Sequence, residues 1–546
     1  MTQTAPAPTG QDGVATVDAV VIGAGFSGLY MLHRLRGLGC SVQVFEVADG
    51  VGGTWYWNRY PGARCDVESM EYSFSFDPQL EQEWQWTEKY PTQPEILRYA
   101  NHVADRFDLR RDIRLGTRVT HTVFDEDAGR WTVRTDRGDQ LSAQFLVHAS
   151  GCLSASKTPE VPGLESFRGR WFHTGHWPHE GVDFTGQRVG VVGTGSSGIQ
   201  SIPLIAEQAA DLTVFQRTPN FTLPAHNHPF EPGFQERLKA HYPDHRQQAR
   251  ASGFGIPVEE PQKSALEATP EEREETYRRR WEDPNGSLVG VLVAYTDLIT
   301  SKEANDTAAE FIRSRIRDIV TDPETAETLC PTDHPVGTKR PCLDTGYYAT
   351  FNRDDVHLVD LKKTPLVEIT PAGIRTSEQE YEFDAIVFAT GFDAMTGALT
   401  RIGIRGRDGL QLAEKWAAGP RTYLGVATAG FPNMFIITGP GSPSVLSNMM
   451  VSIEQHVEWI ADAIGYAREH GTAVIEATRE AEDTWTQHVQ DVGNATLYPT
   501  ANSWYMGANV EGKPRVFMPY IGGVGNYRAV CDDVAAKEYE GFVLAG

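Results

Sequence analysis

One order of hydrophobic and glycine positions occurs twice along this chain. The first copy comprises apolar residues 18–22, a glycine turn, leucines at helical spacing from Leu29 to Leu38, and apolar residues 41–45. The second copy comprises apolar residues 188–192, a glycine turn, a helical run over 196–209, and apolar residues 212–215. A strand that ends in glycine and leads through a helix to another strand is typical of nucleotide-binding folds. The pattern predicts an α/β protein with two Rossmann-type dinucleotide-binding domains.

The composition changes inside the second copy. From 219 to about 332 the chain is rich in Glu and Arg, as in 270–280, which favours helices. Strand-like runs return at 356–360 and 385–389. We therefore expect a helical insertion that covers the open side of the second unit, while 391–546 packs back onto the first unit.

These observations divide the chain into two nucleotide domains and an insertion. The expected boundaries are 17–150 with 391–546 for the first domain, 151–218 with 333–390 for the second domain, and 219–332 for the insertion. Residues 1–16 are rich in Thr, Pro, Gly and Gln and lack the basic start and apolar centre of a signal peptide. We expect them to form a disordered tail.

Charge and cysteine usage narrow the range of partners. The chain has 49 basic and 73 acidic residues, a net charge of −24, and no long basic run, so a nucleic-acid partner is not expected. No apolar stretch is long enough to span a membrane, and nothing indicates a protein partner. The six cysteines show neither a CxxC pair nor a metal-ligand spacing. We expect six unpaired thiols, no metal site and a cytoplasmic location.

Both glycine turns have the GxGxxG pattern that lets a backbone approach a pyrophosphate at a helix N-terminus. Their sequences are Gly23-Ala24-Gly25-Phe26-Ser27-Gly28 and Gly193-Thr194-Gly195-Ser196-Ser197-Gly198. A single match of this kind is weak evidence, but each copy here follows an apolar strand and opens a helix. Two dinucleotides on one chain imply an electron relay between them.

The residue that ends the second strand of each unit differs between the two copies. Glu46, 23 positions after Gly23, can bind ribose hydroxyls. The corresponding position of the second copy is Gln216, followed by Arg217. Arginine binds a 2′-phosphate that a carboxylate would repel, so the second site favours NADPH over NADH. Thr218 and Lys339 are expected to add a hydroxyl and a second positive charge.

Three further segments resemble the flavin-dependent Baeyer–Villiger monooxygenases, in particular the phenylacetone, steroid and cyclohexanone group. The segment 167–178 matches FxGxxxHxxxWP, 52–66 matches GGxWxxxRYPGxxxD, and 389–393 resembles the segment where such chains cross back to the flavin domain. Related N-oxygenating monooxygenases lack the Trp-Pro end of the first motif. The resemblance assigns FAD to the first nucleotide domain and NADPH/NADP⁺ to the second.

The family resemblance also assigns roles to individual residues. It makes Arg340 the active-site arginine and Asp66 the carboxylate that orients it, and both are expected to be catalytic. It places Trp504 against bound NADP⁺. Residues expected near FAD are Gly53, Thr54, Trp55, Tyr56, Trp57, Arg64, Cys65, Asp66, Tyr72 and Met449. We expect Ser444, Val445 and Leu446 to line the ketone pocket. We expect Phe167, Gly169, His173 and Trp177 to couple domain movement rather than to transfer protons.

The activity implied by the resemblance is conversion of a ketone to an ester or lactone with NADPH and O₂, through a peroxide anion at C4a of the flavin. A permanently charged arginine suits this chemistry because both the peroxide and the tetrahedral adduct are anionic. Sulfoxidation is a possible side activity. Two alternatives remain open: an N- or S-oxygenating flavin monooxygenase, and a non-catalytic flavin and NADPH redox sensor. The nature of the ketone is not determined by these residues.

Overall fold

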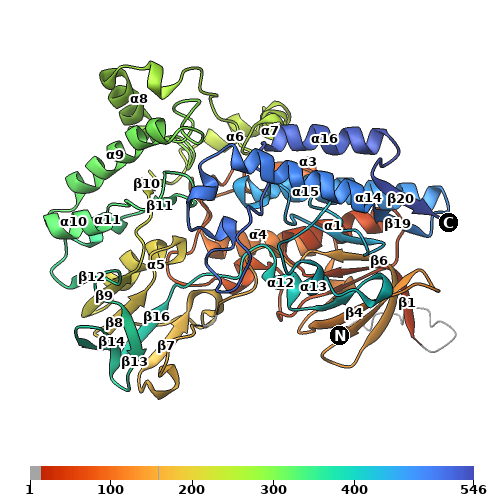
Figure 1. The fold of residues 1–546 in the computed structure, drawn as a ribbon, viewed down its shortest axis with the longest axis horizontal. Coiled ribbons are helices and arrows are strands. Elements are labelled where there is room, and N and C mark those ends of the chain that lie inside the picture. Colours follow the sequence, from red (N-terminus) through yellow and green to blue (C-terminus); the bar gives the residue numbers. More distant parts are fainter. Residues whose placement is uncertain (1–13, 158) are drawn as a thin grey trace.

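The computed structural model describes residues 14–157 and 159–546, which form two lobes with helices across their upper side (Figure 1). The first lobe contains an eight-stranded sheet with the order β17-β4-β5-β6-β1-β2-β3, in which β18 also pairs with β6. Its strands are β1 (Ala15–Ile22), β2 (Val42–Phe45), β3 (Ile113–Arg114), β4 (Val119–Asp125), β5 (Arg130–Thr135), β6 (Gln140–His148), β17 (Gly403–Arg405) and β18 (Met434–Ile436). Strand β1 is parallel to its neighbours β2 and β6, whereas β5 is antiparallel to both of its neighbours, β4 and β6.

The C-terminal part of the chain completes this first domain. Strands β17 and β18 add to its sheet, and helix α14 (Met449–Glu469) packs against α1 (Phe26–Gly37). Arg34 on α1 and Asp462 on α14 form an ion pair with a 2.9 Å separation. Segments before residue 150 and after residue 391 therefore share one sheet and one hydrophobic core.

The second lobe contains a five-stranded, wholly parallel sheet with the order β12-β9-β8-β16-β7. Its strands are β7 (Arg170–His173), β8 (Arg188–Val192), β9 (Asp211–Gln216), β12 (Val356–Asp360) and β16 (Ala385–Phe388), and α5 (Ser196–Ala206) follows the second glycine turn. The fold class predicted from the sequence, α/β with two Rossmann-type domains, is confirmed.

The insertion is mostly helical, but it is divided between the two lobes. Its helices are α6 (Phe234–Lys239), α7 (Tyr242–Ala251), α8 (Pro270–Glu282), α9 (Lys302–Ile319) and α10 (Pro323–Leu329). The last three share a core with the second domain, as expected. In contrast, α7 packs on the first domain, where Arg246 binds Glu81 at 2.9 Å and the Tyr242 hydroxyl donates to the Met70 carbonyl at 3.2 Å. The prediction that the whole insertion covers the second unit is therefore wrong for α7. The side chains on its buried face bind residues of the first domain.

A short strand also departs from the predicted boundaries. Strand β10 (Thr222–Pro224) lies within the insertion and pairs in parallel with β11 (Cys342–Asp344) beyond it. At the other end of the chain, β1 already begins at Ala15, so Ala15 and Thr16 belong to the sheet and not to a tail. Val14 precedes this strand, and the rest of the expected tail, residues 1–13, lies outside the described residues. In the described part, no helix combines the length and apolarity needed to cross a membrane.

Candidate active site

The two glycine turns have the geometry that a phosphate site requires. Gly25 and Gly195 are the N-caps of α1 and α5, and neither helix start is capped by a side chain. Gly23 and Gly193 have φ values of +107° and +110°, which favour glycine. A Cβ at these two positions would also meet carbonyl oxygens at 2.5 and 2.6 Å. Because a Cβ on Gly195 would meet nothing within 4 Å, the second helix start opens into free space suited to a pyrophosphate.

Glu46 lies directly after β2 and is 5% exposed. Its two carboxylate oxygens accept hydrogen bonds from the backbone N–H groups of Ala24 at 2.7 Å and Ala48 at 2.8 Å. Burial raises the pKa of Glu46, and these N–H donors oppose that shift. The carboxylate thus fixes the first glycine turn, and its expected contact with a ribose stays a prediction.

The residues expected at the second ribose gather at the carboxyl edge of the second sheet. Arg217 is exposed and follows β9 directly, while Thr194 donates its hydroxyl hydrogen to the Thr218 carbonyl at 3.0 Å. Lys339 is half-buried, and burial lowers its pKa. The negative charge of Asp333 raises this pKa, whereas the positive charge of Arg217 lowers it further. Arg217 is thus near enough to Lys339 for its charge to affect the Lys339 pKa, which is consistent with the phosphate hypothesis.

Arg340 and Asp66 form a two-pronged ion pair between the second and first domains. Nε and Nη2 of Arg340 donate to the two carboxylate oxygens of Asp66 at 2.6 and 2.7 Å, and Nη1 donates to the Val445 carbonyl at 2.7 Å. Burial lowers the pKa of Arg340, but the charge and hydrogen bonds of Asp66 outweigh burial and raise it. The guanidinium is therefore held charged and in a fixed orientation.

The loop that carries Val445 is strained in a way that presents its carbonyl to Arg340. Ser444 has a φ of +40°, an uncommon value for a residue with a side chain, and its hydroxyl donates to the Thr438 carbonyl at 3.1 Å. Val445 belongs to a small apolar cluster that also includes Leu446, Met449 and Trp504. Of the residues expected at the ketone pocket, Val445 contacts the arginine through its carbonyl, and Leu446 packs in the same apolar cluster as Val445.

The GGxW segment packs between the core of the first domain and the region of the FxGxxxHxxxWP motif at 167–178. Trp55 donates its indole N–H to the Tyr72 hydroxyl at 3.1 Å, and the Trp57 ring lies edge-on to His176 with centroids 5.8 Å apart. Tyr56 contacts His179 in the same manner at 5.0 Å. These aromatic contacts connect the first domain to the loop that follows β7. Of the other residues expected near FAD, Gly53 caps α2 (Thr54–Trp57), Cys65 is buried and Arg64 lies 3.9 Å from Glu88.

His173 links the long motif to the crossover between domains. Its Nδ1 accepts from the Gly175 backbone N–H at 3.0 Å, so Nε2 carries the hydrogen and faces the Thr390 hydroxyl at 3.2 Å. Burial lowers the pKa of His173 to about 4, and the ring is neutral near pH 7. A Cβ at Gly169 would lie 2.5 Å from the Phe167 ring, and Trp177 is 3% exposed in the second domain's core. The motif thus packs at the crossover between the domains, and its coupling role stays a prediction.

Comparison with known proteins identifies the family. Residues 20–262 match the family model described as pyridine nucleotide-disulphide oxidoreductase, which includes both glycine turns. A Baeyer–Villiger monooxygenase of Pseudooceanicola batsensis is 44% identical over 531 residues, covering 97% of this chain and 96% of that protein. The chain belongs to the Baeyer–Villiger monooxygenase family. The solved structure of a steroid monooxygenase bound to NADP superposes with a TM-score of 0.93 at 55% identity, covering 97% of this chain and all of that one.

Family membership establishes the chain as a flavin-dependent monooxygenase that uses FAD and NADP(H). This result sets aside the non-catalytic redox sensor. The N-oxygenating alternative has a relative of its own: a phenazine N-monooxygenase of Lysobacter antibioticus is 44% identical over 529 residues, covering 96% of this chain and 97% of that protein. Baeyer–Villiger family sequences therefore include an enzyme named for oxygenation at nitrogen.

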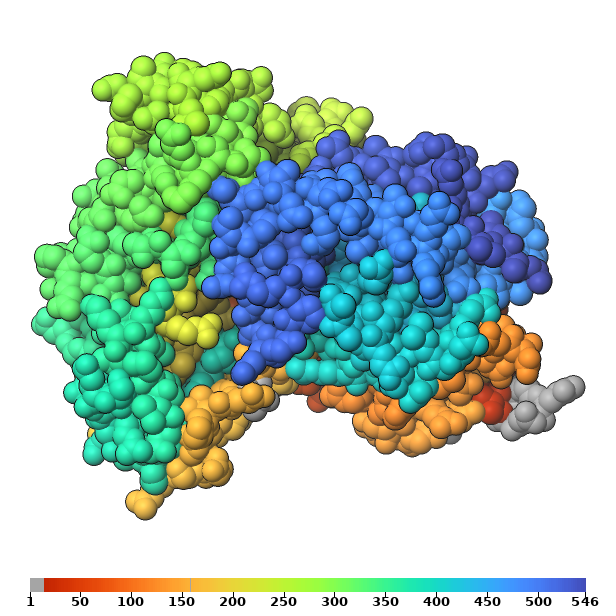
Figure 2. All heavy atoms as spheres, in the orientation of Figure 1, coloured from red at the N-terminus to blue at the C-terminus, as the bar shows by residue number. Residues whose placement is uncertain are grey.

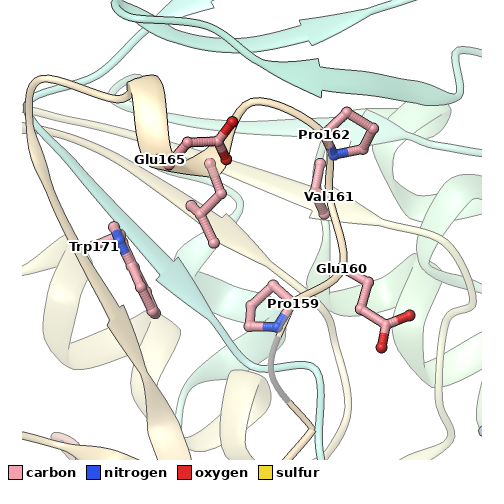
Figure 3. Close-up of a pocket in the computed structure, with 7 residues that line it drawn as sticks. Pro159, Glu160, Val161, Pro162, Glu165 and Trp171 are labelled. Carbon is pink, nitrogen blue, oxygen red and sulfur yellow. The ribbon is translucent and has the colours of Figure 1, made fainter.

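Two hollows in the surface lie outside the Arg340 site. One is lined by residues from Pro159 to Trp171 at the edge of the second domain (Figure 3). Another lies between α4 (Gln93–Arg106) and the loop at Pro178–Gly181, where the two lobes meet. Figure 2 shows the lobes separated by a notch on the face drawn. Neither hollow includes a residue of the glycine turns or of the Arg340–Asp66 pair.

Sequence reasoning missed one residue at the arginine. Tyr505, next to the expected Trp504, is 2% exposed and its phenol faces the Arg340 guanidinium. Burial raises the pKa of Tyr505, although the Arg340 charge opposes this, so the hydroxyl keeps its hydrogen and can donate. No pattern in the sequence distinguishes this tyrosine from a core residue, because its only signal is adjacency to Trp504.

Proposed function

We propose that the protein oxidises a ketone to an ester or lactone with NADPH and O₂, and that Arg340 provides the positive charge for the oxygen anions of this reaction. The supporting observation is the guanidinium geometry. Of the five N–H groups of an arginine, three donate to Asp66 and Val445 within the described part of the chain, and the other two lie within reach of Tyr505 or an anionic oxygen. FAD, when bound, supplies reduction of O₂ with electrons that it receives from NADPH.

The roles of the surrounding residues follow from their contacts. Asp66 fixes the direction of the guanidinium, and the neutral Tyr505 phenol can accept from Arg340 while it donates its own hydrogen to an anionic oxygen nearby. The apolar cluster with Val445, Leu446 and Met449 excludes water and suits a hydrophobic ketone. Arg217, Thr218 and Lys339 would hold the 2′-phosphate of NADPH, and Glu46 with the first glycine turn would hold FAD.

A direct test uses the purified flavoprotein with NADPH, O₂ and a panel of cyclic, aryl-aliphatic and steroid ketones. The expected result is a product heavier by one oxygen atom whose fragmentation identifies an ester or lactone. NADPH consumption that yields only hydrogen peroxide with every ketone would contradict the proposal. Reduction of FAD by NADPH under anaerobic conditions serves as the control for intact cofactor binding.

N-oxygenation is the second candidate function, and sulfoxidation is a side activity compatible with the same site. The phenazine N-monooxygenase relative is as similar to this chain, at 44% identity, as the Baeyer–Villiger relative. Adding a phenazine, a tertiary amine and a thioether to the panel separates these outcomes.

We also propose a cytoplasmic location, which is supported by six cysteines that are all free thiols.

A further inference from the structure

A lysine outside the recognised motifs lies next to the expected 2′-phosphate site. Strands β9 and β12 are parallel, with Gln216 opposite Asp360, and the Leu361 N–H donates to the Gln216 carbonyl at 2.8 Å. The residues that follow the two strands, Arg217 and Lys362, therefore share the carboxyl edge of one sheet. Ligands of open parallel sheets bind at this edge.

A single aspartate binds Lys362 at this edge. Nζ of Lys362 donates to Oδ2 of Asp333 at 2.7 Å, and Oδ1 of Asp333 lies 2.7 Å from Nδ1 of His334. The hydrogen bond from His334, followed by that from Lys362, lowers the pKa of Asp333, so this carboxylate is ionised at neutral pH. Lys339 lies within the electrostatic reach of Asp333, Arg217 and Lys362. Lys362 thus pairs with Asp333, and Lys339 is near enough to both of them and to Arg217 for their charges to affect its pKa.

This edge has two carboxylates, Asp333 and Asp360, the second of which accepts from the Lys362 backbone N–H at 2.9 Å. With the three cations Arg217, Lys339 and Lys362, the edge keeps a net positive charge that another anion would balance. Arg217 has no ion pair with any other described residue, and Asp333 is the carboxylate that Lys362 binds. A 2′-phosphate carries close to two negative charges and can accept hydrogen bonds from several cations at once. Asp333, however, would repel the same phosphate while it competes for Lys362.

We propose that Lys362 is a third cation of the 2′-phosphate site and that Asp333 is its counter-ion when no coenzyme is bound. The proposal rests on the proposed phosphate site at Arg217 and Lys339. NADPH draws Lys362 away from Asp333, whereas NADH, which lacks the phosphate, leaves this pair intact. Lys362 and Asp333 therefore adjust the preference between the two coenzymes in opposite directions, without contact with the nicotinamide or the ketone.

The test compares Lys362→Met and Asp333→Asn in the full-length holoenzyme, with NADH as the internal reference. Lys362→Met is expected to raise KM for NADPH about three- to fivefold and to leave KM for NADH unchanged, as for loss of one exposed ion pair. Asp333→Asn is expected to lower KM for NADPH by a similar factor. Lys363→Met is the matched control, because Lys363 is exposed and its carboxylate neighbour is Glu324 at 3.9 Å.

Equilibrium binding gives a readout that does not depend on turnover. Adenosine 2′,5′-bisphosphate and 5′-AMP are titrated calorimetrically into the oxidised enzyme, and only the bisphosphate is expected to bind more weakly to Lys362→Met. The difference in bisphosphate affinity between the wild-type enzyme and Lys362→Met is expected to shrink at high salt, because exposed charges are screened. If Arg217→Met weakens bisphosphate binding and Lys362→Met does not, the role of Lys362 is refuted while the phosphate site stands. If neither variant weakens it, the phosphate site at Arg217 is refuted as well.

Discussion

Arg340 binds Asp66 through two parallel hydrogen bonds of 2.6 and 2.7 Å that join positions 274 residues apart. The arginine belongs to the second nucleotide domain and the aspartate to the first. Because the guanidinium and the carboxylate are both planar, two parallel bonds fix direction as well as distance. The position of the Arg340 charge thus depends on how the two domains meet.

Replacing Arg340 with Ala is expected to reduce ester or lactone formation by about 100- to 1,000-fold, the usual cost of removing one fixed donor to a developing oxyanion. Anaerobic reduction of FAD by NADPH should persist, because the expected NADPH contacts lie at Arg217 and Lys339. Product formation is measured by mass spectrometry beside hydrogen peroxide release. Arg353→Ala, which removes an exposed pair with Asp355, is the control. An Arg340→Ala enzyme that retains product formation within tenfold would refute the assigned role.

Asp66→Asn is expected to lower product formation by about 10- to 100-fold, less than loss of the arginine, because an amide keeps one acceptor for the guanidinium. Asp66→Ala should be worse than Asp66→Asn, since it leaves two N–H groups of Arg340 without partners. The two variants are compared by kcat with a saturating ketone and by the ratio of product to NADPH consumed. Equal activities for Asn and Ala at this position would show that orientation by Asp66 is unimportant.

Tyr505→Phe tests the phenol beside the guanidinium without removing an aromatic ring. We expect a fall in kcat of about 5- to 20-fold, the value of one hydrogen bond to a charged group, with little change in KM for NADPH. The uncoupled release of hydrogen peroxide should rise accordingly. Tyr498→Phe, a change in a ring that packs against Tyr505 with centroids 5.6 Å apart, controls for altered packing. If both variants behave alike, the Tyr505 hydroxyl has a structural role only.

His148 makes the fold sensitive to acid. It is 1% exposed, both of its ring nitrogens lack partners among the described residues, and burial lowers its pKa to about 3. The unfolded chain takes up a proton below pH 6.5, whereas the folded protein does not until about pH 3, so stability is lost as pH falls through this window. The loss between pH 7 and pH 5 amounts to about 2 kcal/mol.

His148→Leu is therefore expected to raise the unfolding temperature more at pH 5 than at pH 7. Scanning fluorimetry of the FAD-bound protein at both values measures the difference. His357→Leu is the control, since His357 is exposed beside Asp211 and its removal relieves no buried group. An equal shift at both pH values would show that packing, and not protonation, determines the effect.

Local patterns in the sequence were sufficient for the elements that bind nucleotides. Glycine at positions 23 and 193 predicted turns whose φ values the structure places near +110°, and apolar periodicity predicted the strands and helices that flank them. These features depend on residues close together in sequence, where backbone geometry follows from residue type. Roles for Arg340 and Asp66 came from family resemblance, because nothing local relates two positions so far apart.

The sequence by itself determined the two Rossmann-type units, and it predicts a discontinuous first domain and a cationic end of the second ribose site. Only the tertiary structure decided that Arg340 binds Asp66 and Val445 together, that α7 packs on the first domain, and that Tyr505 and Lys362 lie beside the expected sites. Secondary structure follows from the chemistry of neighbouring residues. Contacts between segments from different domains depend on how whole faces pack, and no single stretch of sequence encodes that arrangement.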